Sequence, residues 1–261
     1  MPRRFVLYRD EATPSLDVGE VADFLHRTLA VPVVAKSSFT KVHGRDKGNL
    51  ATAIAATRVS DVSRPLSATE PSYGEIAYEM KLLKDARKKA HGVLYDGGRL
   101  MSVLRDILPP RERDVAIQHV VFTSRLVCTF SGDGRYHARV NICGYPSIIS
   151  TSGIVEAPAK PKEFYVLKQR FLEAGEAAPF ELIRDRFAGQ FIDYDDPRLT
   201  EVLKGYALQC AMHAITGRAF CEKRTCRLFN AHWQSEVLTA QLGGKGLCKK
   251  HEEMMRKFRR I

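Results

Sequence analysis

The sequence predicts a mixed α/β (α+β) fold, and three features of the 261-residue chain support this class. The first is a β-α-β opening, in which "RFVLYRD" (4–10) and "VPVVAK" (31–36) are short β-prone segments around "SLDVGEVADFLHRTL" (15–29). The apolar residues of 15–29 recur at helical spacing, and Ser15 is the predicted N-cap. The second feature is a β-branched region after residue 117, and the third is a long C-terminal helix. Together they predict a mixed or parallel sheet covered by helices.

The middle of the chain predicts further helices. We expect a short one at "NLATAIAATRV" (49–59), a longer one at "GEIAYEMKLLKDARKKA" (74–90) and a third at "GRLMSVLRDIL" (98–108). Pro109 and Pro110 should stop the third helix, because proline cannot continue the backbone hydrogen bonding of a helix.

The β-branched region predicts a hairpin. "HVVFTSRLVCTF" (119–130) and "YHARVNICGY" (136–145) are its expected strands, joined through the turn signature "SGDG", and "PSIIST" (146–151) is a further strand. Downstream, the second half of 160–176 and all of 196–217 are predicted helices. The helix over 196–217 should end at Gly217. Its apolar side is formed by Leu199, Val202, Leu203, Tyr206 and Cys210.

Composition narrows the class of protein. Apolar residues make up 44% of the chain and charged residues 27%, which is typical of a globular protein. No stretch approaches the roughly 18 apolar residues of a membrane span, and "MPRRFVLYRDEATP" is too short for a signal-peptide core. We therefore expect a cytoplasmic protein without a membrane partner.

The chain carries a formal net charge of +11, which permits binding to nucleic acid. Basic residues cluster only at "KLLKDARKKAH" (81–91) and "RKFRRI" (256–261), without the interleaved aromatic residues that stack on RNA bases. These clusters favour a solvated basic face, so nucleic acid is an expected partner only in an alternative hypothesis.

Four residues near the C-terminus have the spacing of a zinc site. Cys221 and Cys226 form one pair, and Cys248 and His251 form a second pair after a spacer. Small zinc sites are built in this way, because each short pair wraps one side of the ion. Three cysteines and one histidine leave no open coordination position, so the predicted zinc is structural. His232 is the alternative fourth ligand.

The other three cysteines, Cys128, Cys143 and Cys210, are isolated among apolar neighbours, which is typical of buried free thiols.

A catalytic zinc site of the zincin type is not evident in the sequence. Such a site needs two histidines four residues apart on one helix, with a glutamate next to the first, and no two histidines of this chain are four apart. The long helix offers only His213, with Cys210 one turn before it as a second weak candidate and Gln209 at the position of a first ligand. No phosphate loop or nucleophile elbow is present either.

The order of these features resembles the archaemetzincins, a family of metzincin-clan metallopeptidases with the motif HExxHxxGxxHC followed by further zinc-binding cysteines. "CAMHAITGRAFC" is similar in frame: Gly217 matches the family glycine and Cys221 the closing cysteine. Cys226, Cys248 and His251 match the later metal ligands. The segment "CRLFNAHWQ" is similar to an archaeal group of metallopeptidase-like proteins. The resemblance implies a zincin-like fold with a structural zinc.

The catalytic part of the motif does not carry over. In this frame the positions of the three histidines are Cys210, Ala214 and Phe220, that of the glutamate is Ala211, and that of the Met-turn methionine is Leu228.

We thus expect one zincin-like domain over residues 1–261, with residues 218–261 as a C-terminal zinc-binding subdomain. The favoured function is a metallopeptidase-lineage protein with a degenerate catalytic motif that binds a peptide or protein. The alternatives are a zinc-containing nucleic-acid-binding protein and an active hydrolase that combines His213 with distant groups such as His119, His137 or Asp193.

Overall fold

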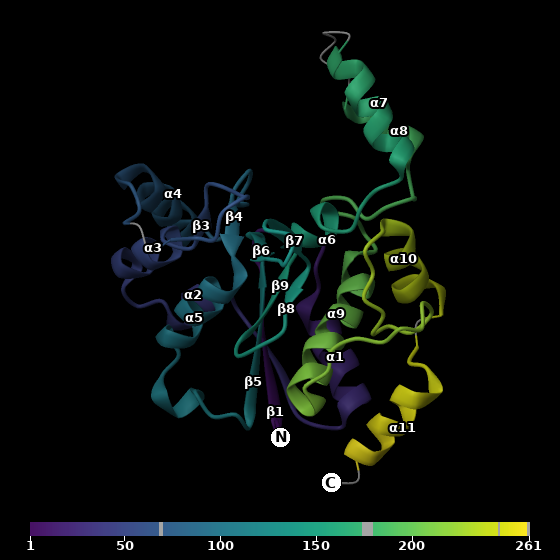
Figure 1. Cartoon of the computed structure of the whole chain (residues 1–261). Coiled ribbons are helices and arrows are strands. Elements are labelled where there is room, and N and C mark those ends of the chain that lie inside the picture. Colours follow the sequence, from purple (N-terminus) through teal and green to yellow (C-terminus); the bar gives the residue numbers. More distant parts are fainter. Residues whose placement is uncertain (68–69, 174–179, 245, 260–261) are drawn as a thin grey trace.

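The centre of the molecule is a five-stranded sheet in the order β2-β1-β5-β9-β8 (Figure 1). The computed structural model describes residues 1–67, 70–173, 180–244 and 246–259. Four strands run parallel, and β8 is an antiparallel edge strand. The strands are β1 (Arg4–Tyr8), β2 (Val33–Lys36), β5 (Ile117–Thr123), β8 (Asn141–Ile142) and β9 (Ser147–Ser150). The predicted α/β (α+β) class with a mixed sheet is confirmed.

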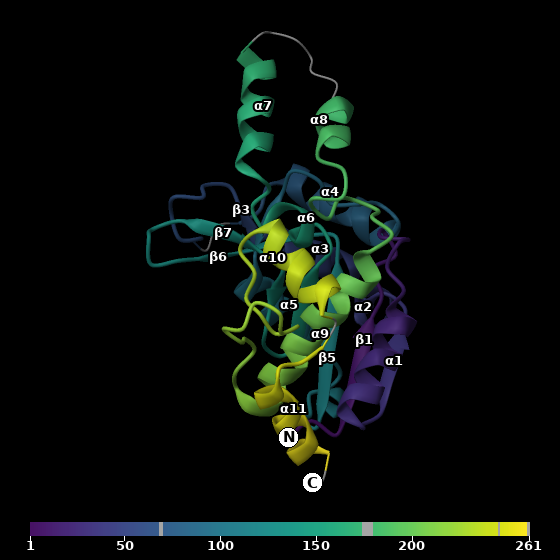
Figure 2. The same cartoon turned by 90° about the vertical axis from the view of Figure 1, so that its right-hand side faces the viewer.

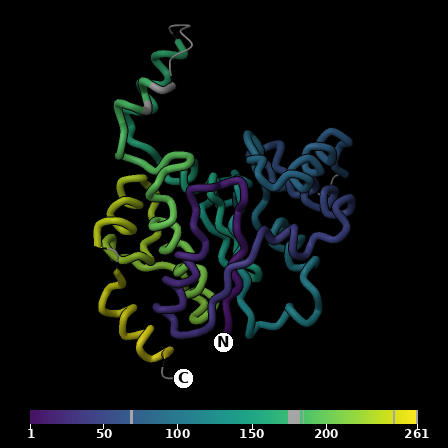
Figure 3. Tube along the Cα trace, turned by 180° about the vertical axis from the view of Figure 1, so that it is seen from behind, coloured from purple at the N-terminus to yellow at the C-terminus, as the bar shows by residue number. Residues whose placement is uncertain are grey.

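Helices cover both faces of this sheet. Alternate residues of β1 enter two cores: Phe5 and Leu7 pack in one, and Val6 and Tyr8 pack in the other. The first core is covered by α1 (Val18–Leu29) and α9 (Leu199–Thr216). The second is covered by α2 (Phe39–His43), α3 (Lys47–Ala55), α4 (Tyr73–Lys84) and α5 (Gly97–Ile107). Strands buried on both faces form continuous apolar runs, as Phe5–Tyr8 of β1 do. From behind, the two helical layers lie on opposite sides of β1 (Figure 3).

A second sheet of four short strands, β3-β4-β6-β7, adjoins the first. Its strands are β3 (Arg58–Val59), β4 (Leu94–Asp96), β6 (Leu126–Phe130) and β7 (Tyr136–Arg139). The predicted hairpin exists only in part, as the antiparallel pair β6–β7. Its predicted strand 136–145 is wrong as one element, because β7 ends at Arg139 and β8 belongs to the first sheet. The predicted strand 119–130 is also wrong as one element. It is broken at Ser124 and Arg125, and its two halves belong to different sheets. The buried ion pair of Arg125 with Glu79 lies at this break.

Two helices project from the body as an arm (Figure 2). They are α7 (Lys162–Glu173) and α8 (Phe180–Arg186), and they follow the short helix α6 (Gly153–Glu156). The base of the arm has a small core of its own: Phe164, Ile183, Phe187 and Phe191. Helix α7 begins earlier than the predicted second half of 160–176, and residues 174–176 of that prediction lie outside the described residues.

The C-terminal segment returns to the α1–α9 side of the sheet. It contains α10 (Gln234–Leu238), a π-helical turn (Thr239–Gly243) and α11 (Lys249–Phe258). Elsewhere in the chain, a 3-10 turn (Pro110–Glu112) follows α5. Val237 of α10 and Met255 of α11 pack into the core shared with α1 and α9. The division at residue 218 stays a prediction.

The structure shifts several predicted helix ends. Asp17, and not Ser15, caps α1: its carboxylate accepts the backbone N–H of Glu20, and it directly precedes the first helical residue. Helix α4 ends at Lys84 because the next residue, Asp85, is extended. Helix α9 ends at Gly217 as predicted, with φ of 73° at this glycine. In the described part of the chain, no helix has the length and apolar character to cross a membrane.

Candidate metal centre and adjoining cleft

The first half of the metal centre is a turn between Cys221 and Cys226. The backbone N–H of Cys221 donates to the carbonyl of Leu228, and the N–H of Cys226 donates to the carbonyl of Lys223. The N–H of Lys223 in turn points at the Cys221 sulfur, 3.4 Å away. A short loop closed by its own backbone hydrogen bonds thus holds both thiols on one side.

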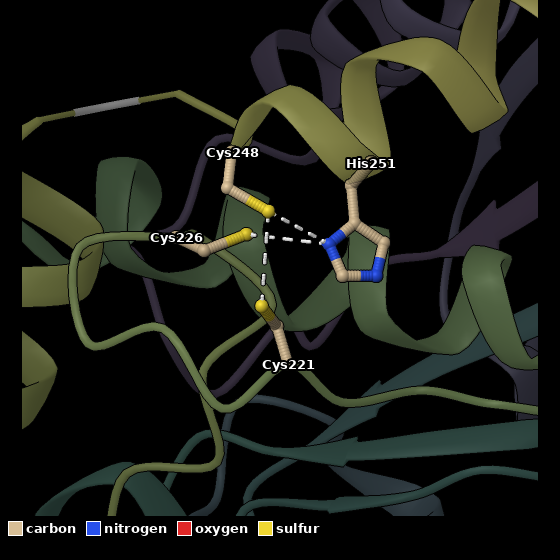
Figure 4. Close-up of side chains that lie close together, drawn as sticks. All are labelled: Cys221, Cys226, Cys248 and His251. Carbon is tan, nitrogen blue, oxygen red and sulfur yellow. Dashed lines mark hydrogen bonds between the residues drawn. The ribbon is translucent and has the colours of Figure 1, made fainter.

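The second half begins α11. Cys248 is the N-cap residue, and the N–H of His251 donates to its carbonyl. Residues three apart share one face of a helix, so the Cys248 sulfur and the His251 ring point to the same place. Figure 4 shows these two side chains facing Cys221 and Cys226 across a small gap.

The distances among the four side chains fit a tetrahedral zinc ion. The sulfurs of Cys221 and Cys248 are 3.8 Å apart, and Nδ1 of His251 lies 3.2 Å from the Cys248 sulfur and 3.8 Å from the Cys226 sulfur. All four ligand atoms lie within 4.8 Å of one another. Zinc bonds of about 2.3 Å to sulfur and about 2.0 Å to nitrogen at tetrahedral angles place sulfurs about 3.8 Å apart and sulfur and nitrogen about 3.5 Å apart. The four groups could therefore hold one zinc after side-chain shifts of about 1 Å or less.

The ionisation of these groups also suits a cation. Burial raises the pKa of the Cys226 thiol to about 12, so a bound cation is required to keep this sulfur as a thiolate near neutral pH. At Cys248, burial acts to raise the pKa, but hydrogen bonds from the backbone N–H groups of His251 and Lys250 and from the Cys221 and Cys226 thiols together lower it. Burial lowers the pKa of His251, which favours the neutral imidazole that binds metals.

His232, the alternative fourth ligand, is not part of this cluster. Its ring lies 3.4 Å from the side-chain nitrogen of Asn230, and it lines a separate cleft. The geometry therefore favours His251 over His232 in the ligand set.

That cleft, with a volume of about 720 Å³, lies between the edge strand β8 and helix α9. Among the described residues it is lined from β8 by Asn141 and Ile142, and from α9 by Tyr206 and His213. The loop after α9 adds Arg218 and Phe220, and the segment after Cys226 adds His232.

The two weak catalytic candidates, His213 and Cys210, do not share the cleft. His213 lines the cleft, whereas Cys210 is fully buried behind the cleft wall. Gln209 is buried as well: its oxygen accepts from Asn141 at 3.0 Å, and its nitrogen donates to the carbonyl of Phe229 at 3.0 Å. Gln209 thus ties α9 to β8. Within the described ranges, the one group of three or more His, Cys, Asp or Glu ligands that could hold a metal is the Cys221–Cys226–Cys248–His251 set.

The distant groups proposed to assist His213 lie elsewhere. His119 is fully buried on the opposite face of the sheet, where Nδ1 is 2.9 Å from the Tyr8 hydroxyl. His137 pairs with Asp133 on the solvent side of β7, and Asp193 lines a different, small cavity. The part of the chain that the structure describes places none of the three in the cleft lining.

The two basic clusters also lie apart. Residues 81–91 comprise the last turn of α4 and the segment after it on one side of the molecule. The described part of 256–261 lies at the end of α11 on the other side (Figure 1). Lys89 of the first cluster forms an ion pair with Asp195. Residues 260–261 lie outside the described residues.

One feature was missed from the sequence. Cys143 is not a buried, isolated thiol, because it is partly exposed in the cleft lining and its sulfur lies 3.9 Å from that of Cys210. The two residues are 67 positions apart, and neither belongs to a spacing motif, so no sequence signal joins them.

A family model described as "Probable metallopeptidase family (DUF6775)" matches residues 1–258. The chain belongs to this metallopeptidase family. A solved zinc-dependent peptidase from Methanocorpusculum labreanum (strain Z) is similar at 13% identity and a TM-score of 0.48, covering 97% of this chain and 99% of that chain. No curated protein matches the sequence. The expected relation to metallopeptidases is confirmed at this level, and the narrower resemblance to archaemetzincins stays a prediction.

Proposed function

We propose that the chain is a peptide-binding member of its metallopeptidase family, with one structural zinc and without a conventional catalytic zinc. The observation that carries this proposal is the cleft between β8 and α9, which contains His213 but no zinc-ligand cluster among the described residues. The proposal assigns the zinc to stability and the cleft to recognition.

The zinc is structural because Cys221, Cys226, Cys248 and His251 fill all four positions of a tetrahedral ion. A catalytic zinc keeps one position open for water. Without that position the ion cannot lower the pKa of a bound water or polarise a peptide carbonyl. Its contribution is to fasten α11 and the loop after α9 to each other.

The cleft suits an extended peptide. β8 is the last strand of its sheet, and a peptide can add to such an edge through backbone hydrogen bonds while its side chains occupy pockets on either side. The hydrogen bond between Asn141 and Gln209 holds β8 against α9, so the strand is already fixed before a peptide arrives. A site that is formed in advance loses less entropy on binding.

The charge of the cleft favours an acidic peptide. Its described lining contains Arg139, Arg218, His213 and His232 and no carboxylate. The Arg139 guanidinium donates to Thr129 and Ser131, which fixes its position at the wall. Arg218 is exposed and its side chain is available to pair with a carboxylate of the ligand.

Fluorescently labelled peptides of acidic and basic composition test this proposal. The acidic peptides should bind more tightly, and Arg218→Gln should weaken their binding by roughly five- to tenfold, as expected for the loss of one charge-assisted contact. Arg87→Gln is the matched control: it removes the same charge from an exposed arginine far from the cleft, and binding should stay unchanged.

The same mixtures should be analysed for cleavage with zinc supplied. We expect intact peptides, because His213 has no second histidine and no glutamate base beside it. Chelator-sensitive cleavage that disappears in His213→Ala would overturn the proposed absence of catalysis. Equal affinity for acidic and basic peptides, or equal losses in the two arginine variants, would contradict the assignment of the cleft.

A further inference from the structure

Two cysteines meet at the wall of the cleft. Cys143 follows the edge strand β8, and Cys210 lies in the middle of α9. Their sulfurs are 3.9 Å apart, although the two residues come from different elements. This contact belongs to neither the zinc cluster nor the proposed peptide contacts.

The surroundings of the pair favour a thiolate on one sulfur. The side-chain nitrogen of Asn141 lies 3.7 Å from the Cys143 sulfur and 3.9 Å from the Cys210 sulfur, and its position is fixed by Gln209. An amide that points its N–H groups at a sulfur stabilises negative charge there. Cys143 also lines the cleft, so a reagent of small size can reach it, whereas Cys210 is fully buried.

The ionisation of the two thiols differs in the same sense. The hydrogen bond with Cys210 lowers the pKa of Cys143, and the same contact, together with burial, raises the pKa of Cys210. This is the division of roles in a reactive dithiol: an accessible thiolate attacks, and a buried thiol resolves.

We propose that Cys143 and Cys210 form a thiol-modification site that reacts with low-molecular-weight disulfides and closes into an intramolecular disulfide. The Cys143 thiolate attacks one sulfur of oxidised glutathione, forms a mixed disulfide and releases one glutathione thiolate. The Cys210 sulfur then attacks the Cys143 sulfur, and the Cys143–glutathione bond breaks. The Cys210 proton passes to the departing glutathione sulfur, which leaves as the second glutathione thiol. Two protein thiols are oxidised, one glutathione disulfide is reduced to two thiols, and no other oxidant is needed.

Closing this bond requires a small movement. The sulfurs must approach by about 2 Å to reach the length of a disulfide. Cys143 directly follows the two-residue strand β8, so a change in its side-chain rotamer can bring its sulfur toward α9 without breaking a strand hydrogen bond. The bond would link the strand side of the cleft to its helix side and remove the thiolate from the lining. The inference does not depend on peptide binding.

The test is incubation of zinc-loaded protein with oxidised glutathione, followed by proteolysis and mass spectrometry. We expect a fragment pair linked through Cys143 and Cys210, the loss of two free thiols per chain and unchanged zinc content. Cys210→Ser should stop at a glutathione adduct on Cys143, and Cys143→Ser should give neither product. The control cysteine is Cys128, whose pKa burial raises to about 12, and it should react at least about tenfold more slowly than Cys143.

Three results would overturn the proposal, and the first two need no variant. The first is a glutathione adduct on wild-type Cys143 that persists without linkage to Cys210. The second is an absence of any reaction of Cys143 and Cys210 in zinc-loaded protein. The third is a disulfide from Cys143 to a cysteine other than Cys210, with Cys143 reacting equally fast in wild type and in Cys210→Ser. Retention of a second metal by an unreactive pair would identify the contact as a metal site instead.

Discussion

Replacing Cys226 with serine should remove zinc and unfold the C-terminal segment together. Cys226 is buried, its sulfur faces His251, and it lies in the core shared with α1 and α9. Zinc binding to sites of this composition is worth on the order of 10 kcal/mol, which is as large as the total stability of a typical domain. The variant should therefore lose most of its zinc and show a much lower midpoint of thermal unfolding.

A matched control is Cys128→Ser. Cys128 is equally buried, and its thiol donates to the carbonyl of Tyr95, a bond that a serine hydroxyl can also form. This variant should keep its zinc, measured by metal analysis of purified protein. If Cys226→Ser cannot be purified, titration of the wild type with a chelator should show zinc loss and unfolding in one transition. Full zinc retention in Cys226→Ser would show that the ligand set is wrong.

Replacing Arg125 with methionine should destabilise the fold by about 3–5 kcal/mol, because it leaves a buried carboxylate without its cation. The guanidinium of Arg125 lies 2.7 Å from Glu79, and the Glu79 side chain is fully buried. After the substitution, the carboxylate would keep the hydrogen bond from the Tyr95 hydroxyl, which lies 2.6 Å from its other oxygen, but would have lost its cation. Urea unfolding monitored by circular dichroism measures the loss.

The double variant Arg125→Met with Glu79→Leu separates a lost charge partner from lost packing. It removes both charges, so most of the stability should return. A double variant as unstable as Arg125→Met alone would show that packing, and not the unpaired carboxylate, accounts for the effect.

The metal ligands could be proposed from sequence because their geometry is local. Cys221 and Cys226 lie in one turn, and Cys248 and His251 lie in the first turn of α11, so each pair is positioned by its own backbone. The only long-range requirement is that the two halves meet, and the spacer between them allows it. The β-α-β opening and α9 were predictable for the same reason, since periodicity and end signals are properties of single segments.

The cleft could not be predicted in this way. Its walls bring β8, α9 and the loop after α9 together, and the contacts that fix it, such as Asn141 with Gln209, join residues far apart in the chain.

The second sheet was also not predicted from the sequence. Its two-residue strand β3 and three-residue strand β4 are too short to produce a recognisable alternation. The break at Arg125, between β5 and β6, was missed because it depends on a buried partner, Glu79, that lies far away in sequence in helix α4.

X-ray absorption spectroscopy of the zinc-loaded wild type tests the central claim most directly, because it reports the number and kind of atoms around the metal. We predict a zinc bound by three sulfurs at about 2.3 Å and one nitrogen at about 2.0 Å, with no bound oxygen. An oxygen ligand on the zinc would reveal an open coordination position and contradict the assignment of the metal to structure alone.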